Sequence, residues 1–393
     1  MLPRIFALTV CSLAATLTLA ACASGSRSGP SASGSASDAA GTHSGQSLAA
    51  EAAPATPLRA GERFETVSMP RPYTPKAPNG GTDEYRCFLL DPQLTAPAFL
   101  TGNQFVPQNV AMVHHAILYR VDTAITAAAR GLDARSPEQG WTCFGDDGLG
   151  DSAWVGHWAP GVVETPLTPG VGYDLPVGSM LVVQVHYNLL AVTAGTAGSD
   201  QSAVRLRLTD DTTGIRALET AQLSAPIELP CTPEESGPLC DRDTALADVA
   251  HRFGQDVGQT EPALLSFCSD SKPAPGPTQS CDYPVEQAGT VYAVAGHMHL
   301  LGRSISIELN PGKPDAQALL EVPVYNFDDQ GIRVLTAPVR LKAGDTLRVT
   351  CRHDATLRKL VPALQKLPPR YVVWGDGTSD EMCLGLVVLT PTT

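Results

Sequence analysis

Two histidines separated by one residue, His297 and His299, follow the apolar run 290–294. In an extended strand successive side chains point to opposite faces, so both imidazoles project to one side and Met298 projects to the other. Two converging imidazoles are the beginning of a metal site. Solvent-facing or hydrogen-bonded histidines are the alternative, and this spacing alone does not decide between them.

Three further histidines and a methionine provide donors for two sites. His114 and His115 are adjacent, His186 lies in the apolar segment 179–187, and Met382 lies in an acidic turn. Imidazole and thioether donors without a free-thiol site favour copper over zinc, magnesium or calcium. Adjacent side chains of a regular strand point to opposite faces, so His114 and His115 can reach one ion together only from a bulge or a strand end.

Strands are the elements predicted to position these side chains. Short apolar runs are separated by segments rich in Gly and Pro, and few stretches have the period of a helix. The sequence therefore predicts an all-β fold. Examples of predicted strands are 179–187, 203–208, 304–309 and 371–374, and the helical candidates are 123–130, 245–253 and 357–367.

The first residues resemble a targeting signal. Arg4 precedes an apolar stretch, 5–19, that is too short to span a membrane. It ends in Leu19-Ala20-Ala21-Cys22, the pattern of a bacterial lipoprotein signal of residues 1–21 with the lipid on Cys22. An ordinary secretory peptide cut nearby is the alternative, and both interpretations predict export.

Residues 22–61 are mostly Ser, Gly, Ala, Thr and Pro, a composition that predicts a disordered tether. We therefore expect a protein anchored at the bacterial cell envelope, on its periplasmic face or on the cell surface. Contact with the membrane would be through the lipid alone.

About 330 residues follow the tether, which is enough for two domains of ordinary size. The stretch 215–230 is poorly periodic and contains proline, so we place the boundary there, between a domain of residues 62–214 and one of residues 215–393. The formal net charge of −13 argues against nucleic acid as a partner, because a basic binding face is not expected.

Eight cysteines follow the leader and Cys22, and an even number in an exported chain predicts disulfides. No C-x-x-C sequence occurs, which weakens a zinc-ribbon interpretation. Four of the eight fall within 228–284 and allow three pairings. Among these we favour Cys231 with Cys240 and Cys268 with Cys281.

Four motifs occur in order along the chain: Met112-Val113-His114-His115-Ala116-Ile117-Leu118-Tyr119, Gln184-Val185-His186-Tyr187, His297-Met298-His299-Leu300-Leu301-Gly302 and Gly377-Thr378-Ser379-Asp380-Glu381-Met382-Cys383. From about residue 62 onward the chain resembles the copper type II, ascorbate-dependent monooxygenases, the family of peptidylglycine α-hydroxylating monooxygenase and dopamine β-hydroxylase. The resemblance implies two jelly-roll-like β-sandwiches that face each other across an open cleft. It also implies disulfides between Cys87 and Cys143 and between Cys351 and Cys383.

The resemblance further implies one copper ion in each half. His114, His115 and His186 would hold the ion that supplies an electron. The catalytic ion, which meets dioxygen, would be held by His297, His299 and Met382, whose thioether favours Cu(I). The implied reaction is hydroxylation of a C–H bond of a small molecule with O₂ and two electrons from ascorbate or another small reductant.

Neighbouring residues receive weaker assignments. Gln184 and Tyr187 flank a proposed ligand and are expected to orient an imidazole, with strand packing as the alternative. We assign His157 and His353 to structure or to the surroundings of the ligands. Tyr85, two residues before Cys87, is either structural or substrate-facing.

The chain departs from the peptide-amidating members at two positions. Those enzymes bind a substrate carboxylate through an arginine and a tyrosine, where this sequence has Ala295 and Leu386. The change predicts an apolar substrate. The alternative function is a lipid-tethered protein that binds or delivers copper without turnover, although two unlike sites favour an enzyme; in either case we expect a monomer.

Overall fold

The structure, a computed structural model, describes residues 55–190, 192 and 198–392. The predicted signal peptide, Cys22 and most of the predicted tether lie outside these residues. The last part of the tether, residues 55–61, is described and packs on the fold. Thr56 donates its backbone N–H to Glu164 at 2.7 Å, and Arg59 donates to the carbonyl oxygens of Leu167 and Thr101. The folded part therefore begins before the expected boundary at residue 62.

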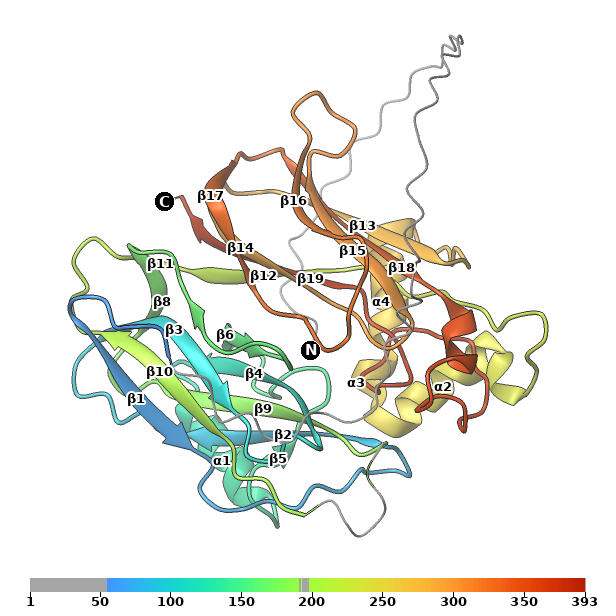
Figure 1. Cartoon of the computed structure of the whole chain (residues 1–393), viewed down its shortest axis with the longest axis horizontal. Coiled ribbons are helices and arrows are strands. Elements are labelled where there is room, and N and C mark those ends of the chain that lie inside the picture. The colour runs from blue at the N-terminus through green and yellow to red at the C-terminus, as the bar shows by residue number, and fades with distance from the viewer. Residues whose placement is uncertain (1–54, 191, 193–197, 393) are drawn as a thin grey trace, which may run out of the picture.

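Four sheets make up the fold, and Figure 1 shows one pair, coloured blue to green, beside a second pair that is mostly orange to red. The first two sheets, which we call the N-terminal sheet pair, enclose one apolar core. One of them orders β1 (Glu62–Ser68), β10 (Ala203–Thr209), β3 (Ala98–Val106), β8 (Val171–Leu175) and β11 (Arg216–Ala217), with β7 (Thr165–Pro166) paired to β3. The other orders β5 (Trp141–Thr142), β2 (Asp83–Leu90), β9 (Met180–Asn188), β4 (Val113–Val121) and β6 (Ala153–Trp158).

The remaining two sheets, the C-terminal sheet pair, enclose a second apolar core. One orders β12 (Glu219–Ser224), β19 (Leu384–Pro391), β14 (Gly289–His297) and β17 (Arg333–Leu341). The other orders β13 (Thr278–Pro284), β18 (Thr346–His353), β15 (Gly302–Leu309) and β16 (Gln317–Val322). The prediction of an all-β fold with two antiparallel sandwiches in tandem is confirmed.

Helices lie outside the sheets. The helix predicted over 123–130 is α1 (Thr126–Arg135), and the one predicted over 245–253 lies within α2 (Arg242–Phe253). The helix expected over 357–367 is wrong, since that stretch holds only the end of the 3₁₀ turn η2 (Ala355–Lys359) followed by turns. Three further elements were not predicted: η1 (Pro238–Cys240), α3 (Gln255–Gly258) and α4 (Thr260–Ser269).

Disulfides join the four cysteine pairs expected from the sequence: Cys87–Cys143, Cys231–Cys240, Cys268–Cys281 and Cys351–Cys383. Cys351 belongs to β18 and Cys383 directly precedes β19, so this bond links the two sheets of the C-terminal pair. Cys383 is also the last residue of the loop 375–383, which carries Met382, so the disulfide anchors the end of this loop. We call this segment the Met382 loop.

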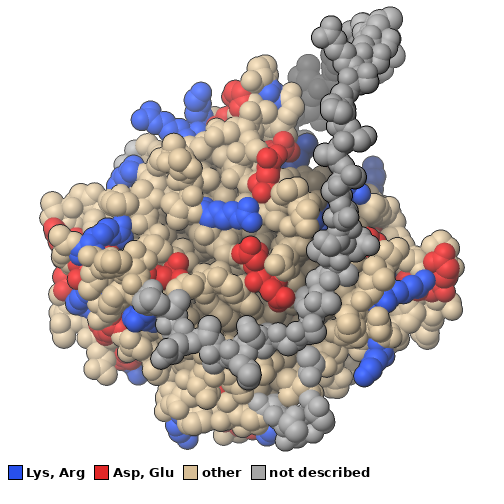
Figure 2. All heavy atoms as spheres, in the orientation of Figure 1, with Lys and Arg blue, Asp and Glu red and all other residues tan. Residues whose placement is uncertain are grey.

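Charged side chains of both signs are interspersed on the face shown in Figure 2, where much of the described surface is uncharged. Among the described residues, no helix combines the length and the apolar character needed to cross a membrane.

We expect the Cys351–Cys383 bond to stabilise the protein more than the Cys231–Cys240 bond. The Cys351–Cys383 bond joins residues 32 positions apart, and the Cys231–Cys240 bond joins residues 9 positions apart. The loop-closure relation predicts that the longer loop adds about 1 kcal/mol more to the free energy of unfolding. Cys351→Ala/Cys383→Ala should therefore lower the free energy of unfolding in urea by at least that much more than Cys231→Ala/Cys240→Ala. Equal losses for the two double variants would contradict the prediction.

Candidate metal centre

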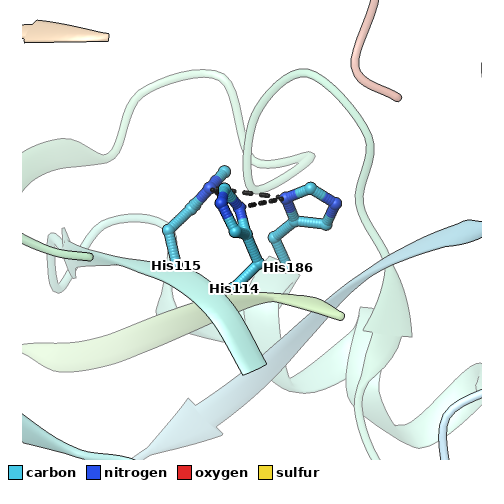
Figure 3. Close-up of side chains that lie close together, drawn as sticks. All are labelled: His114, His115 and His186. Carbon is cyan, nitrogen blue, oxygen red and sulfur yellow. Dashed lines mark hydrogen bonds between the residues drawn. The ribbon is translucent and has the colours of Figure 1, made fainter. Parts of the chain in front are cut away.

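Three histidines of the N-terminal sheet pair converge on one point (Figure 3). His114 and His115 lie on β4, and His186 lies on the adjacent β9. The register between these strands pairs Val113 with Tyr187 and His115 with His186, so one residue is inserted at His114. This is the bulge that the tandem pair requires, and it turns both imidazoles toward His186.

The facing atoms of this triad are the three Nδ1 nitrogens. They are 3.1 Å apart between His114 and His115, 3.2 Å between His114 and His186, and 3.3 Å between His115 and His186. The centre of such a triangle is about 1.8 Å from each corner, close to the metal–imidazole bond length of about 2.0 Å. The triad could therefore hold a copper ion through these three nitrogens.

Burial keeps the triad neutral, as metal ligands must be. Burial lowers the pKa of His114 and His115 far below the usual value for histidine, and the neighbouring imidazoles add to this effect. Burial also lowers the pKa of His186, although Asp83 opposes the shift. Nε2 of His186 donates to Oδ1 of Asp83 at 2.9 Å, which leaves the lone pair on the Nδ1 that faces the triad.

Tyr85, rather than Tyr187, contacts the ligand rings. Its ring stacks on that of His186 with centroids 4.2 Å apart and meets His115 edge-on. Because side chains alternate across β9, Tyr187 faces the core and donates its hydroxyl to Asp200 at 3.0 Å. Gln184 lies on the face of His186 but donates its amide to the carbonyl oxygens of Cys143 and Asp146.

A second histidine group comes from the C-terminal sheet pair. His297 ends β14, and His299 follows it with ring centroids 5.1 Å apart, while Met298 is buried in the core. Nδ1 of His299 donates to the carbonyl oxygen of Asp380 at 3.2 Å, and its Nε2 is buried with no hydrogen-bond partner. An unpartnered buried nitrogen of this kind is a donor atom suited to a metal. His297 is held through Nδ1 by the amide oxygen of Gln330.

Glu381 joins Met382 to this group. One carboxylate oxygen of Glu381 accepts the backbone N–H of His299 at 2.9 Å and that of Met382 at 3.3 Å. The other oxygen accepts the N–H of Leu301. The same carboxylate therefore fixes the backbone on both sides of the group, and Met382 itself is half-buried.

Asp380, the neighbour of Glu381, anchors the Met382 loop to α2. Arg252 donates to both of its oxygens at 2.7 Å, and Arg370 adds a bond of 3.1 Å. Burial alone would raise the pKa of Asp380, but the two guanidinium groups hold it below its usual range. Gly377 makes this packing possible, since a Cβ there would lie 2.7 Å from Asp380 and 2.8 Å from Phe253.

The two histidine groups contact each other. The rings of His115 and His297 have centroids 5.2 Å apart, and His157 lies 6.3 Å from His115 and 6.4 Å from His297. Phe327 makes a second bridge, stacking on His114 at 4.1 Å and meeting His299 at 6.4 Å. The histidines are buried, so the expectation of two groups separated by an open cleft is wrong for this structure.

Sequence reasoning missed three side chains that hold the histidines: Asp83, Gln330 and Glu381. These three residues stand in sequence contexts typical of ordinary turns or strand ends, where a polar side chain is usually exposed. The sequence therefore gives no sign that they are buried. Glu381 and Asp380 lie in the acidic turn beside Met382, and both are buried. A carboxylate beside a candidate ligand is the available signal.

Ala295 and Leu386 are paired across β14 and β19 and are buried in the C-terminal core. His353 is also buried, with Nε2 3.4 Å from the Glu381 carboxylate.

Stability should depend on pH through Asp376, whose carboxylate is buried and accepts no side-chain hydrogen bond. Burial, together with nearby Asp380 and Asp146, raises its pKa to about 7. Folded protein therefore keeps a proton that unfolded chains release near pH 4, so this contribution is present below pH 4 and is lost as pH rises to 7.

Unfolding free energies of wild type and Asp376→Asn, measured from pH 4 to pH 8, should therefore diverge as pH rises. We expect wild type to lose on the order of 3–4 kcal/mol relative to the variant, since one pKa unit corresponds to about 1.4 kcal/mol. The exposed Asp243→Asn is the control. Parallel curves for wild type and Asp376→Asn would refute the prediction.

Comparisons with known proteins match the C-terminal part of the chain to a family. A search of curated proteins found no match. Among solved structures, the major capsid protein P2 of bacteriophage PM2 is 8% identical over 84% of this chain and 98% of its own, with a TM-score of 0.29.

Allantoicase is 10% identical over 75% of this chain and 78% of its own, with a TM-score of 0.17, and such TM-scores support no inference. Residues 276–392, which include His297, His299 and Met382, match the family model of the copper type II ascorbate-dependent monooxygenase, C-terminal domain.

Proposed function

We propose that this protein is a copper-dependent monooxygenase that hydroxylates a C–H bond of a small apolar substrate with O₂ and ascorbate or another small reductant. The observation that carries the proposal is the buried triad of His114, His115 and His186 next to a segment that matches a copper monooxygenase domain. The family match includes no residue of the triad, so the two findings are independent.

The residues divide into two ligand sets, one for each of two copper ions. His114, His115 and His186 would hold one ion, and His297, His299 and Met382 would hold the other. Copper, when bound, supplies electron transfer and the activation of O₂. The net reaction converts the C–H bond, O₂, two electrons and two protons into an alcohol and water.

The protein's own contribution is to fix the donor atoms and to exclude water. Asp83 holds His186 in one tautomer, and the Asp380 carbonyl does the same for His299. Burial lowers the pKa values of His114, His115, His186 and His297, so the lone pairs of these four imidazoles stay available. Met382 is the most exposed of the six side chains, which supports access for a substrate on its side.

An apolar substrate is supported by the positions that bind a carboxylate in the peptide-amidating members. Ala295 and Leu386 carry no charge and pack in the core. Neither residue can form the charged hydrogen bonds that select a carboxylate.

Copper delivery is the alternative function. A protein that passes copper to a partner needs ligands within reach of that partner. The five histidines of the two sets are buried, at most 5% exposed, which favours chemistry within the protein.

Export and lipid anchoring are part of the proposal. They are supported by the sequence that ends at Cys22 and by the four disulfides, which form in oxidising compartments.

Copper binding and oxygen uptake test the function together. Purified wild type should bind two copper ions per chain and consume O₂ when ascorbate is present. His186→Ala and Met382→Ala should each abolish most of the uptake, because each removes a ligand from a different set. His251→Ala, at an exposed position of α2, is the matched control and should behave as wild type.

Two copper ions without oxygen uptake under any reductant would instead support copper binding or delivery. Loss of binding in His251→Ala as well as in the site variants would show that the measured copper is bound outside the site.

A further inference from the structure

One carboxylate is shared between the two halves of the site. Asp83 begins β2 and is 2% exposed. Its Oδ1 accepts Nε2–H of His186 at 2.9 Å, and the same oxygen accepts the hydroxyl of Thr378 at 2.5 Å and its backbone N–H at 3.2 Å. Oδ2 accepts the hydroxyl of Thr82 at 2.9 Å. Asp83 therefore contacts a ligand of the N-terminal triad and a residue of the C-terminal half at once.

Thr378 belongs to the Met382 loop, and internal bonds make this loop a stiff unit. Glu381 accepts the N–H of Met382, while Asp380 donates its own N–H to the carbonyl oxygen of Gly377 at 2.8 Å. Gly375 donates to the carbonyl oxygen of Glu381 at 3.1 Å. A shift of Thr378 is therefore transmitted to Glu381 and Met382 rather than absorbed by a mobile turn.

A second contact runs in parallel. Tyr85 stacks on His186 and donates its hydroxyl to the backbone carbonyl of Asp376 at 2.9 Å. Two neighbours of one imidazole, Asp83 and Tyr85, thus both reach the Met382 loop.

We propose that the Asp83–Thr378 contact positions the two ligand sets relative to each other. Copper binding at His186 is thereby coupled to the position of the Met382 loop. The proposal rests on the proposed copper function. A cation on Nδ1 of His186 draws charge from the ring and strengthens its Nε2–H as a donor to Asp83. Oδ1 of Asp83 also accepts from Thr378, so a change on one side alters the bond on the other. Coupling between two binding sites is reciprocal.

The test asks whether a residue of the Met382 loop affects copper at the triad. His299→Ala in the full chain removes a ligand of the second set, so that the remaining copper reports on the triad. In this background Thr378→Val removes the hydroxyl at nearly constant volume, and Thr378→Ser retains it. Copper affinity by competition and the Cu(II) electron paramagnetic resonance spectrum are the measurements.

Removing a direct partner of a ligating histidine usually costs about 10- to 100-fold in affinity, and Thr378 acts on His186 through Asp83, so Thr378→Val should weaken the affinity by about 10-fold. It should also change the Cu(II) hyperfine splitting. Thr378→Ser should restore both values. Identical affinities and spectra for the Val and Ser variants would overturn the coupling while leaving the copper function intact. If the His299→Ala parent bound no copper, both proposals would fail.

A folding defect is separable from loss of coupling. The near-ultraviolet circular dichroism of each variant reports on packing, and Thr378→Ala, which removes the hydroxyl and fills less space than valine, provides a second substitution. If Thr378→Val does not fold, Thr378→Ala must show the weaker affinity and the altered spectrum, and an unchanged affinity in that variant would overturn the proposal.

Discussion

Burying several imidazoles in one contiguous cluster is the constraint on which the rest of this structure depends. A buried charge without a partner is costly, so burial drives these groups to their neutral forms, and the pKa values of His114, His115, His186 and His297 are lowered. Each neutral ring then has one N–H and one nitrogen with a free lone pair. The hydrogen-bond partners around the ring determine which nitrogen carries the proton. Asp83 and the Asp380 carbonyl make that choice for His186 and His299.

The carboxylates of Asp83 and Asp380 are themselves buried. Each needs hydrogen bonds or a cation nearby to offset the cost of burying its negative charge. Hydrogen bonds from His186 and Thr378 hold the pKa of Asp83 below its usual range in spite of burial. Arg252 and Arg370 do the same for Asp380, and Arg252 lies on α2, within the cysteine-rich segment between β12 and β13. That segment therefore has a role beyond its disulfides, because it supplies the cation that keeps a loop carboxylate charged.

How much of this could be predicted depends on whether the signal is local. The tandem pair at His114 requires a bulge, a deduction from strand geometry alone, and the register of β4 on β9 contains it. The pairings of Cys231 with Cys240 and of Cys268 with Cys281 are close in the chain, which made them the natural choice. The helix α4 was not predicted, and its start lacks the side-chain cap that would have marked it in the sequence.

The contacts between the halves were beyond the reach of sequence reasoning, because they join residues up to 295 positions apart. Nothing local marks Asp83 as the partner of both His186 and Thr378, since an acidic residue at the start of a strand is ordinarily solvated. The same limit explains why Tyr187 was expected to orient an imidazole and Tyr85 was not: Tyr187 is adjacent to a ligand in the sequence. Side chains alternate across a strand, so the residue next to a ligand in the chain points to the opposite face. The residue that contacts His186 is instead its partner on the neighbouring strand, Tyr85.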